Sequence, residues 1–536
     1  MHKIFSFSLL ILFSLFSKGQ SLEIPPRQPT DTNRVIEIIY AKNLRQITLN
    51  DSVSLEALSG NATVKQGNTI LKGDSIIINK QTGILEVFGN VHINDADTVN
   101  TYAQYLKYIG SEKIAYLKNK VSLFDGKAQL FTDDLVYNVE TGIATYQGGG
   151  KVINDKTTLT SREAVYYSDT KDVFFKQNVH LRDPKYTMDA DSLRYNTIFK
   201  NAYFISPTHI VSESGIIDTH SGTYNLETGE AVFTDKTVFR DSVRFISGNK
   251  VAIEEKTGLI QIEGNGKFVD SLNKVIVLGN QLLIDKKNST FLATRKPVMI
   301  IYSDHDSTYI SADTLFSGKR IREIKKDTLP LDTTCISSKS IAVGTVKDSI
   351  SYFIGFHHVR IFNDSIQAVS DSLHYSTEDS TFKLFQHPIC WNGQTQLSGD
   401  TMYLFTENQQ AKKLMVFNNA IAINQTKEGL FNQISGRTMN GFFKEGNIEY
   451  IRTKGSPAES IFYPQDENGG YIGMNRSKGD VIDVFFVKKE LNKVKFVNDV
   501  TGTLYPLKQI PAEIKQLKNF DWQDKRRPKN KLELFE

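Results

Sequence analysis

The chain has 536 residues but only two cysteines and 13 prolines, and its formal charge of +4 is small for its length. Two cysteines allow one disulfide at most, and the weak net charge argues against nucleic acid as a partner. Helix-forming runs of Ala, Leu, Glu and Lys are scarce, whereas Phe, Tyr, Thr, Val and Ile are prominent. This composition favours β-strands over helices.

Catalytic motifs are also absent from the sequence. There is no Gly-x-Ser-x-Gly elbow, His-Glu-x-x-His helix or Cys-x-x-Cys pair, and Gly148-Gly-Gly150 does not open a helix as a phosphate loop would. His357 and His358 are adjacent, so on a strand their rings would point to opposite faces and could not chelate one ion. The sequence therefore predicts no enzyme, no cofactor and no metal site.

Long apolar runs are missing except at the N-terminus. Met1-His-Lys3 is followed by an apolar run from Ile4 to Phe16 and by Ser17-Lys-Gly-Gln20, which is the pattern of a secretory signal peptide over residues 1–20. The run is short for a membrane span, which needs about 20 apolar residues, although an uncleaved anchor is the alternative. In an oxidising compartment Cys335 and Cys390 could pair, but two free thiols are the favoured interpretation.

One sequence unit recurs along almost the whole chain. Its template is a polar residue, any residue, an aliphatic, any residue, an aromatic or aliphatic, and a polar turn-former, as in Asp191-Ser-Leu-Arg-Tyr-Asn196. Successive units open about 30 residues apart, a spacing typical of solenoids and repeat arrays. Clear units open at Asp74, Asp133, Glu163, Asp191, Asn249, Asn280, Asp313, Asp371 and Asp400, and weaker ones at Gln104, His220, Lys339, Arg437 and Asp480.

Each unit predicts two or three short strands with one apolar face. Because side chains alternate across a strand, Asp191, Leu193 and Tyr195 are expected on one face, with the acid at a corner where it hydrogen-bonds the backbone. Turn sequences that end in glycine follow, for example at Gly83 and Gly142. A unit this small buries its apolar face only by stacking. We therefore predict an all-β fold, a repetitive β-jelly-roll or β-solenoid of stacked short antiparallel strands in two consecutive stacks.

The repeat weakens at one place and ends before the C-terminus. A charged, proline-containing stretch from Gly318 to Ser338 lacks alternation and is expected to be a surface insertion or a seam between stacks. The tail after Pro506 is rich in lysine and arginine and is predicted to be mostly disordered. The predicted parts are a signal peptide (1–20), a first stack (35–317), an insertion or seam (318–338), a second stack (339–505) and a basic tail (506–536).

The inward apolar residues permit two interpretations. In a closed solenoid they fill the interior completely, and the protein is an envelope scaffold or adhesin without lipid cargo. In an open roll with splayed sheets they line an apolar trough that can hold acyl chains. Composition does not separate the two, since both need the same inward pattern.

Several segments resemble the OstA/LptA-like proteins (organic solvent tolerance, lipopolysaccharide transport). Ala190-Asp-Ser-Leu-Arg-Tyr-Asn196 is similar to that family's Ala-Asp-x-Leu-x-Tyr strand, and Phe88-Gly-Asn-Val-His-Ile93 to its Gly-Asn-Val corner. Ser370-Asp-Ser-Leu-His-Tyr-Ser376 is nearly as close, and the resemblance extends from 35 to 505. The chain is far longer than a single periplasmic bridge subunit, and it resembles the long OstA-like proteins of the Bacteroidetes type.

The resemblance implies a periplasmic, non-enzymatic protein that holds lipopolysaccharide acyl chains in an apolar groove and supports outer-membrane assembly. Its implied partners are lipopolysaccharide or a related lipid, other β-jelly-roll transport components at the inner and outer membranes, and further copies of itself end to end. Basic residues near the groove mouth, for example Arg194 and Lys107, could meet lipid phosphates, and solvated surface positions are the alternative for them. The groove would be lined by Ile76, Ile78, Val91, Ile93, Leu135, Tyr137, Val165, Tyr167, Leu193, Tyr195, Val251 and Ile253.

Overall fold

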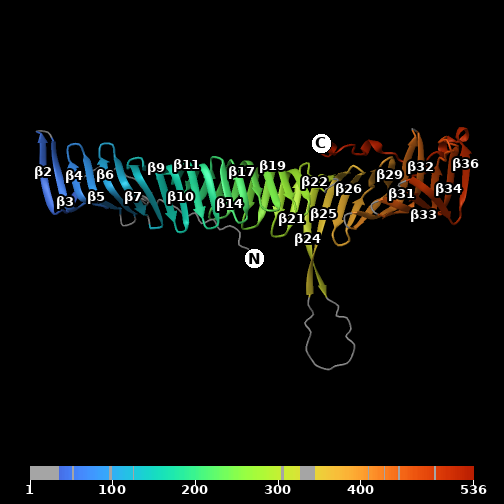
Figure 1. The fold of residues 1–536 in the computed structure, drawn as a ribbon, viewed down its shortest axis with the longest axis horizontal. Coiled ribbons are helices and arrows are strands. Elements are labelled where there is room, and N and C mark those ends of the chain that lie inside the picture. The colour runs from blue at the N-terminus through green and yellow to red at the C-terminus, as the bar shows by residue number, and fades with distance from the viewer. Residues whose placement is uncertain are drawn as a thin grey trace, which may run out of the picture. The chain divides into compact units, whose positions relative to one another are not determined.

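The computed structural model describes residues 36–50, 53–95, 99–124, 126–302, 307–325, 345–407, 410–427, 429–444, 447–487 and 490–535. The predicted signal peptide and Cys335 lie outside these residues. The chain forms two compact units, 1–258 and 259–536. Both are built almost entirely of antiparallel strands, which confirms the predicted all-β fold (Figure 1).

In unit 1 the long strands between residues 53 and 196 pair with the strands that precede and follow them in the chain, as the colour gradient in Figure 1 makes visible. The short strands between residues 201 and 225 skip a neighbour, as where Asn201 lies opposite Asn225. Its strands are β1 (Glu37–Tyr40), β2 (Asn43–Asn50), β3 (Val53–Gln66), β4 (Thr69–Asn79), β5 (Ile84–Asp95), β6 (Val99–Ile109), β7 (Ile114–Phe124), β8 (Ala128–Asn138), β9 (Ile143–Asn154), β10 (Thr157–Tyr167), β11 (Asp172–Asp183), β12 (Tyr186–Asn196), β13 (Asn201–Phe204), β14 (Thr208–Ser212), β15 (Gly215–Thr219), β16 (Ser221–Asn225), β17 (Glu230–Arg240) and β18 (Arg244–Glu254).

The long strands bend near their middle, and the bend divides each unit into two layers. In the β4–β5 pair the register shifts between Lys72 and Ser75, opposite Gly89 and Asn90, which both have positive φ. Glycine and asparagine tolerate this left-handed backbone better than other residues. In unit 1 we call the half-strands on the Lys72 side of the bends layer A and those on the Ser75 side layer B. In unit 2, layer A lies on the Ala420 side and layer B on the Phe417 side of the register shift between these two residues. The predicted Gly-Asn corner is thus the line along which the two layers meet.

Unit 2 repeats this bent-strand pattern and ends in short 3-10 turns. Its elements are β19 (Leu259–Asp270), β20 (Val275–Asp285), β21 (Thr290–Thr294), β22 (Val298–Tyr302), β23 (Ser307–Ser311), β24 (Thr314–Lys325), β25 (Thr345–Phe362), β26 (Ile366–Ser376), β27 (Thr381–Phe385), β28 (Ile389–Asn392), β29 (Thr395–Ser398), β30 (Thr401–Glu407), β31 (Gln410–Lys427), β32 (Leu430–Lys444), β33 (Asn447–Phe462), β34 (Gly473–Val487), β35 (Glu490–Val497), β36 (Thr501–Pro506), η2 (Leu507–Gln509), η3 (Ala512–Ile514), η4 (Asp524–Arg526) and η5 (Lys531–Leu534).

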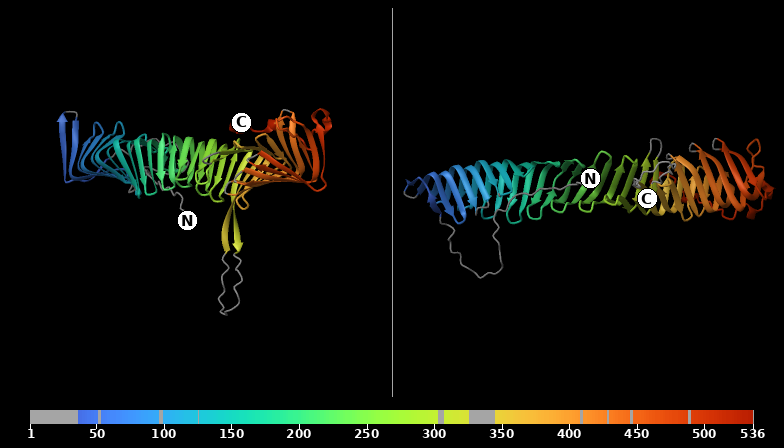
Figure 2. Two further views of the ribbon diagram at one scale, coloured as in Figure 1. Left: turned by 45° about the vertical axis from the view of Figure 1, so that its right-hand side comes forward. Right: turned by 90° about the horizontal axis from the view of Figure 1, so that it is seen from below.

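The division of the chain differs from the predicted one. The units separate at Gly258, whereas the sequence suggested either a surface insertion or a seam between stacks at 318–338. Residues 318–325 instead continue β24, which pairs with β25 without interruption from Thr314 opposite Phe356 to Lys325 opposite Thr345. These two strands project from unit 2 as a ribbon (Figure 2). The backbone hydrogen bonds between the two strands therefore continue through residues 318–325, although the many charged residues there show no apolar alternation in the sequence. Residues 326–338 lie outside the described part.

The basic tail is also different from the prediction of a mostly disordered end. Residues 507–535 form η2 to η5 and lie against the strands of unit 2. Leu517 and Leu534 are buried, and Phe520 and Trp522 pack against a cluster that contains Ile423. The tail is ordered because these apolar residues, set among its lysines and arginines, bury against the sheet.

Candidate functional site: the interior between the layers

The acids that open the repeat units lie at the corners, as predicted, where they bond groups on the neighbouring strand. The Asp74 carboxylate accepts both contacts from the Asn90 side-chain amide at 3.1 Å, and Asp400 is bonded in the same way by Asn419. Asp74 is exposed while Ile76 is fully buried, so the acid does not share the face of the following aliphatic. The bend explains this correction, because strand alternation is broken between the two residues.

His357 and His358 occupy one of these corners. Both have positive φ, so the expected strand alternation does not apply to them. Their rings nevertheless diverge, since His357 Nδ1 lies 3.1 Å from Asp371 and His358 Nδ1 lies 2.9 Å from Asp313. Asp371 raises the pKa of His357 above its usual value by hydrogen bonding and charge. Each histidine is therefore held by a different corner acid.

The interior between layers A and B is the candidate site, and most of the predicted lining residues point into it. Seven of them are buried: Ile76, Ile78, Val91, Leu135, Leu193, Tyr195 and Val251. Ile93, Tyr137 and Ile253 alternate in step with buried neighbours and are half-buried. Val91 and Ile93 come from layer A, and the others from layer B.

Val165 and Tyr167 are on the wrong face, which corrects the prediction for β10. Tyr167 is 37% exposed, whereas Ala164 and Tyr166 are buried. The reason is a one-residue error in the frame of this unit. The hydroxyl of Ser161 donates to the carbonyl of Glu163 (2.9 Å), as Thr132 does to Asp134 and Ser370 to Ser372. Since Asp133 and Asp371 follow those two hydroxyl residues, the unit opens at Arg162 rather than Glu163, and a shift of one reverses every side chain.

A small cavity in unit 1 is lined by apolar side chains from both layers. Its volume is about 20 Å³, close to the space that one water molecule needs. Leu130 and Val152 contribute from layer A. The layer B residues are Leu135, Ala144, Tyr146, Ala164, Tyr166, Val173 and Phe175. Of this set the sequence prediction named Leu135 alone. The residues of β9 and β11 were missed because the template describes the other strand of each pair.

Buried tyrosines bring a few polar atoms to this interior. The Tyr146 hydroxyl and the Ser161 hydroxyl are 2.6 Å apart. Burial raises the pKa of Tyr146 to about 12 and also raises the pKa of Tyr166. Both phenols are therefore neutral at physiological pH, which keeps the interior uncharged.

These phenols predict alkaline sensitivity of unit 1. A tyrosine in the unfolded chain ionises near pH 10, so stability that is present below pH 10 should be lost as the pH rises toward 12. We expect Tyr146→Phe to flatten this loss in urea unfolding followed by hydrogen exchange of unit 1 peptides from pH 9 to 12. Tyr167→Phe, on the exposed face, is the matched control. An unchanged slope in Tyr146→Phe would contradict the assignment.

The basic residues expected at a groove mouth lie elsewhere. Arg194 is on the outer face of layer B, where it pairs with Asp172 at 3.0 Å and lies 4.5 Å from the centre of the Tyr203 ring. Lys107 pairs in register with Glu86 and Tyr116 on the outer face of the same layer. Both follow the alternation that sends Leu193 and Leu106 inward. Their role toward phosphates therefore has no support from their positions.

The described residues contain no cluster of three or more His, Cys, Asp or Glu side chains that could hold a metal ion. Cys390 has a free thiol whose pKa is raised to about 12 by burial. Among the described residues no helix is long and apolar enough to cross a membrane.

The bent, consecutive antiparallel strands around an apolar interior define a β-jelly-roll repeat protein. A family model described as "OstA-like protein" matches residues 33–191 and 187–247. The match covers most of unit 1, and the resemblance seen in the sequence is confirmed for these residues.

Other comparisons add little to this assignment. One matching solved structure is the crystal structure of LptH from Pseudomonas aeruginosa, described as the LptA homologous periplasmic component of the conserved lipopolysaccharide transport device. It is 17% identical, covers 22% of this chain and 84% of its own, and has a TM-score of 0.19. No curated protein matches the chain.

Proposed function

We propose that this protein is a periplasmic, non-enzymatic bridge that binds lipopolysaccharide or a related lipid and supports its transport to the outer membrane. The acyl chains would lie between layers A and B. The observation that carries the proposal is the match of residues 33–247 to the OstA-like family model, together with an interior lined by apolar side chains from both layers. Export by a cleaved signal peptide at 1–20 remains part of this proposal.

The interior must widen to accept a chain. Ile76, Leu193 and Tyr195 are at most 1% exposed, and a cavity of about 20 Å³ is far smaller than an acyl chain. Lipid would have to part the layers, replacing contacts between side chains by contacts with methylenes. Each buried methylene contributes about 0.8 kcal/mol, so an acyl chain can offset much of the lost packing. It would bind without a fixed polar anchor and could slide.

The terminal strands offer a way to join neighbouring β-rolls. Among the described strands, β1 and β2 pair with β3 alone, and Ile38, Ile39, Tyr40 and Leu44 on them are exposed. An unpaired strand edge of this kind can add another strand by backbone hydrogen bonding. We propose that transport components at the two membranes, or another copy of this chain, pair there.

The alternative is a closed solenoid that acts as an envelope scaffold or adhesin without lipid cargo. The small cavity favours it specifically, because a filled interior needs no ligand. The two functions differ in whether lipid ever contacts the residues between the layers.

Photo-crosslinking in cells distinguishes them. A photoreactive amino acid at Leu135 faces the interior, and the same group at Val136 faces outward on the same strand. We expect lipopolysaccharide adducts at position 135 and at least about tenfold fewer at 136, since a strand separates the two faces. Equal adducts at both positions, or none at either while the protein is folded and exported, would reject the lipid-carrier function.

A further inference from the structure

The C-terminal segment 507–535, which we call the strap, crosses the outer face of layer A in unit 2. Buried residues alternate here between two clusters. Ala420 and Ala422 of β31 pack toward layer B, whereas Ile421 and Ile423 pack with Leu517 of the strap. Layer A of unit 2 is therefore covered on both faces.

Two buried glutamines bind the backbone of the strap. Gln433 donates to the Lys515 carbonyl at 2.9 Å and accepts from the Leu517 amide at 2.8 Å. Gln396 donates to the Asp521 carbonyl at 2.6 Å and accepts from the Gln523 amide at 2.8 Å. A carboxamide offers one donor and one acceptor group, as a peptide unit does. Each glutamine therefore holds the strap backbone through two hydrogen bonds, one donated and one accepted.

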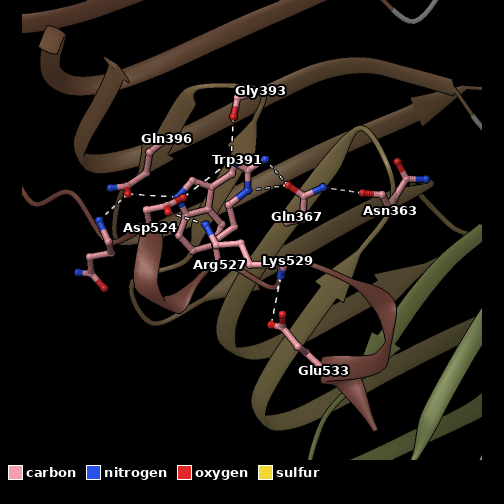
Figure 3. A network of polar contacts seen from close by, with 10 residues as sticks. Asn363, Gln367, Trp391, Gly393, Gln396, Asp524, Arg527, Lys529 and Glu533 are labelled. Carbon is pink, nitrogen blue, oxygen red and sulfur yellow. Dashed lines mark hydrogen bonds and ion pairs between the residues drawn. The ribbon is translucent and has the colours of Figure 1, made fainter. Parts of the chain in front are cut away.

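Further contacts tie the strap to other strands of unit 2. Arg527 donates to the Gln367 side chain and to the Gly393 carbonyl, both at 2.8 Å (Figure 3). Arg360 of β25 donates to the Glu533 carbonyl at 2.6 Å, and Arg476 of β34 donates to that of Ile514 at 3.3 Å. One segment therefore bonds strands from β25 to β34 and restrains their movement relative to one another.

The outer face of layer A in unit 1 is polar. It carries exposed polar pairs, such as His180 with Asp189 and His209 with Asp218. Among the described residues no segment of unit 1 crosses its strands in the way the strap crosses those of unit 2. An apolar outer face of layer A therefore occurs where the strap covers it in unit 2.

We propose that the strap is a lock that keeps the two layers of unit 2 closed, so that lipid enters unit 2 only when the strap is released, whereas unit 1 opens without such a step. This inference rests on the proposed lipid-carrier function. The physical reason is that layers joined at corners can part only if their strands twist or shift. A crosswise segment bonded to several strands opposes both movements.

The test weakens the strap in the otherwise complete protein. Gln396→Glu combined with Gln433→Glu places carboxylates against the Asp521 and Lys515 carbonyls, so two donated hydrogen bonds become repulsive contacts. Gln129→Glu, on the outer face of layer A in unit 1, is the matched control. Hydrogen exchange of peptides that contain Leu517 and Gln523 reports release, and we expect it to accelerate by about tenfold or more, since each lost 1.4 kcal/mol is a factor of ten.

Lipid entry is read from photoreactive groups at Met402 in unit 2 and Leu135 in unit 1, with purified lipopolysaccharide as the probe. We expect adducts at 402 to rise several-fold in the double variant and adducts at 135 to stay constant. If exchange accelerates without more adducts at 402, the lock is refuted while the carrier function stands. If neither position forms adducts in any variant, the carrier function itself fails.

A second variant covers the case in which the double substitution leaves the strap in place. The chain is ended after Pro506, and a synthetic peptide of residues 507–536 is added back. The lock predicts more adducts at Met402 on truncation and a return to the original amount with the peptide. Adducts at 402 that are as frequent with the strap bound as without it would overturn the proposal, and so would a truncated protein that is folded yet loads no better.

Discussion

Replacing Trp391 with alanine is expected to lower the free energy of unfolding of unit 2 by about 3–5 kcal/mol, the range for deleting a buried aromatic side chain. Trp391 is 0% exposed and packs with Val369 and Ile389. Its indole nitrogen donates to Gln396 at 3.2 Å, and Gln396 in turn holds the strap. The substitution therefore leaves a cavity. It also removes a hydrogen bond that positions the Gln396 carboxamide, which binds Asp521 and Gln523 of the strap.

Hydrogen exchange in urea, followed on peptides of β28 and β29, measures this loss locally, which is appropriate for a repeat protein whose parts unfold separately. Trp391→Phe keeps most of the volume and should cost much less. Trp522→Ala, a partly buried strap residue, controls for loss of an indole. A loss below about 1 kcal/mol for Trp391→Ala, typical of surface substitutions, would contradict this role.

The fold could be predicted because the repeat units show the same alternation of apolar and polar residues. Leu193 and Tyr195 alternate with polar residues, and such alternation determines which face is buried. The corner acids were also predictable, since Asp favours local hydrogen bonds to groups at a corner. Because neighbouring units carry the same strand pattern, an error in assigning the faces of one unit does not change the predicted fold.

The errors arose where the repeat is disturbed. Glu163 was taken as a template acid although Arg162 holds that position, because β10 also carries an aromatic residue one place later. The signal that would have corrected it is the small hydroxyl residue before the bend, Ser161, which corresponds to Thr132 and Ser370 in other units. Hydroxyl side chains at a bend are recognisable only after the hydrogen bonds are known.

The strap was missed for a different physical reason. Its eight lysines and arginines suggested a solvated tail, and the apolar Leu517, Phe520 and Trp522 are too few to form a repeat unit. Its partners Gln396 and Gln433 occupy strand positions where a polar residue would ordinarily face water. Long-range pairing of a tail with such glutamines leaves no local pattern in the sequence.

A charged residue is expected to lower stability far more on the inner face of layer B than on its outer face. Ile76 and Ile77 are the same residue type on adjacent positions of β4, but Ile76 is fully buried between the layers and Ile77 is half-buried on the outer face. Ile76→Asp is expected to lower local stability by about 4 kcal/mol or more, because it removes a buried aliphatic group and buries a carboxyl. Ile77→Asp should cost only about 1 kcal/mol, the span of strand preferences.

Function should divide in the same way if lipid passes between the layers. Because each repeat contacts only its neighbours, Ile76→Asp damages one level of the roll while the remainder folds, and a charged level should block sliding acyl chains. We expect lipopolysaccharide delivery to the cell surface to fall in Ile76→Asp and to be retained in Ile77→Asp, at matched protein amounts. A milder variant, Ile76→Ala, controls for stability, since it loosens the interior by about 2–5 kcal/mol without a charge. Delivery that follows stability alone across the three variants would point to the scaffold, because only a used interior is sensitive to charge.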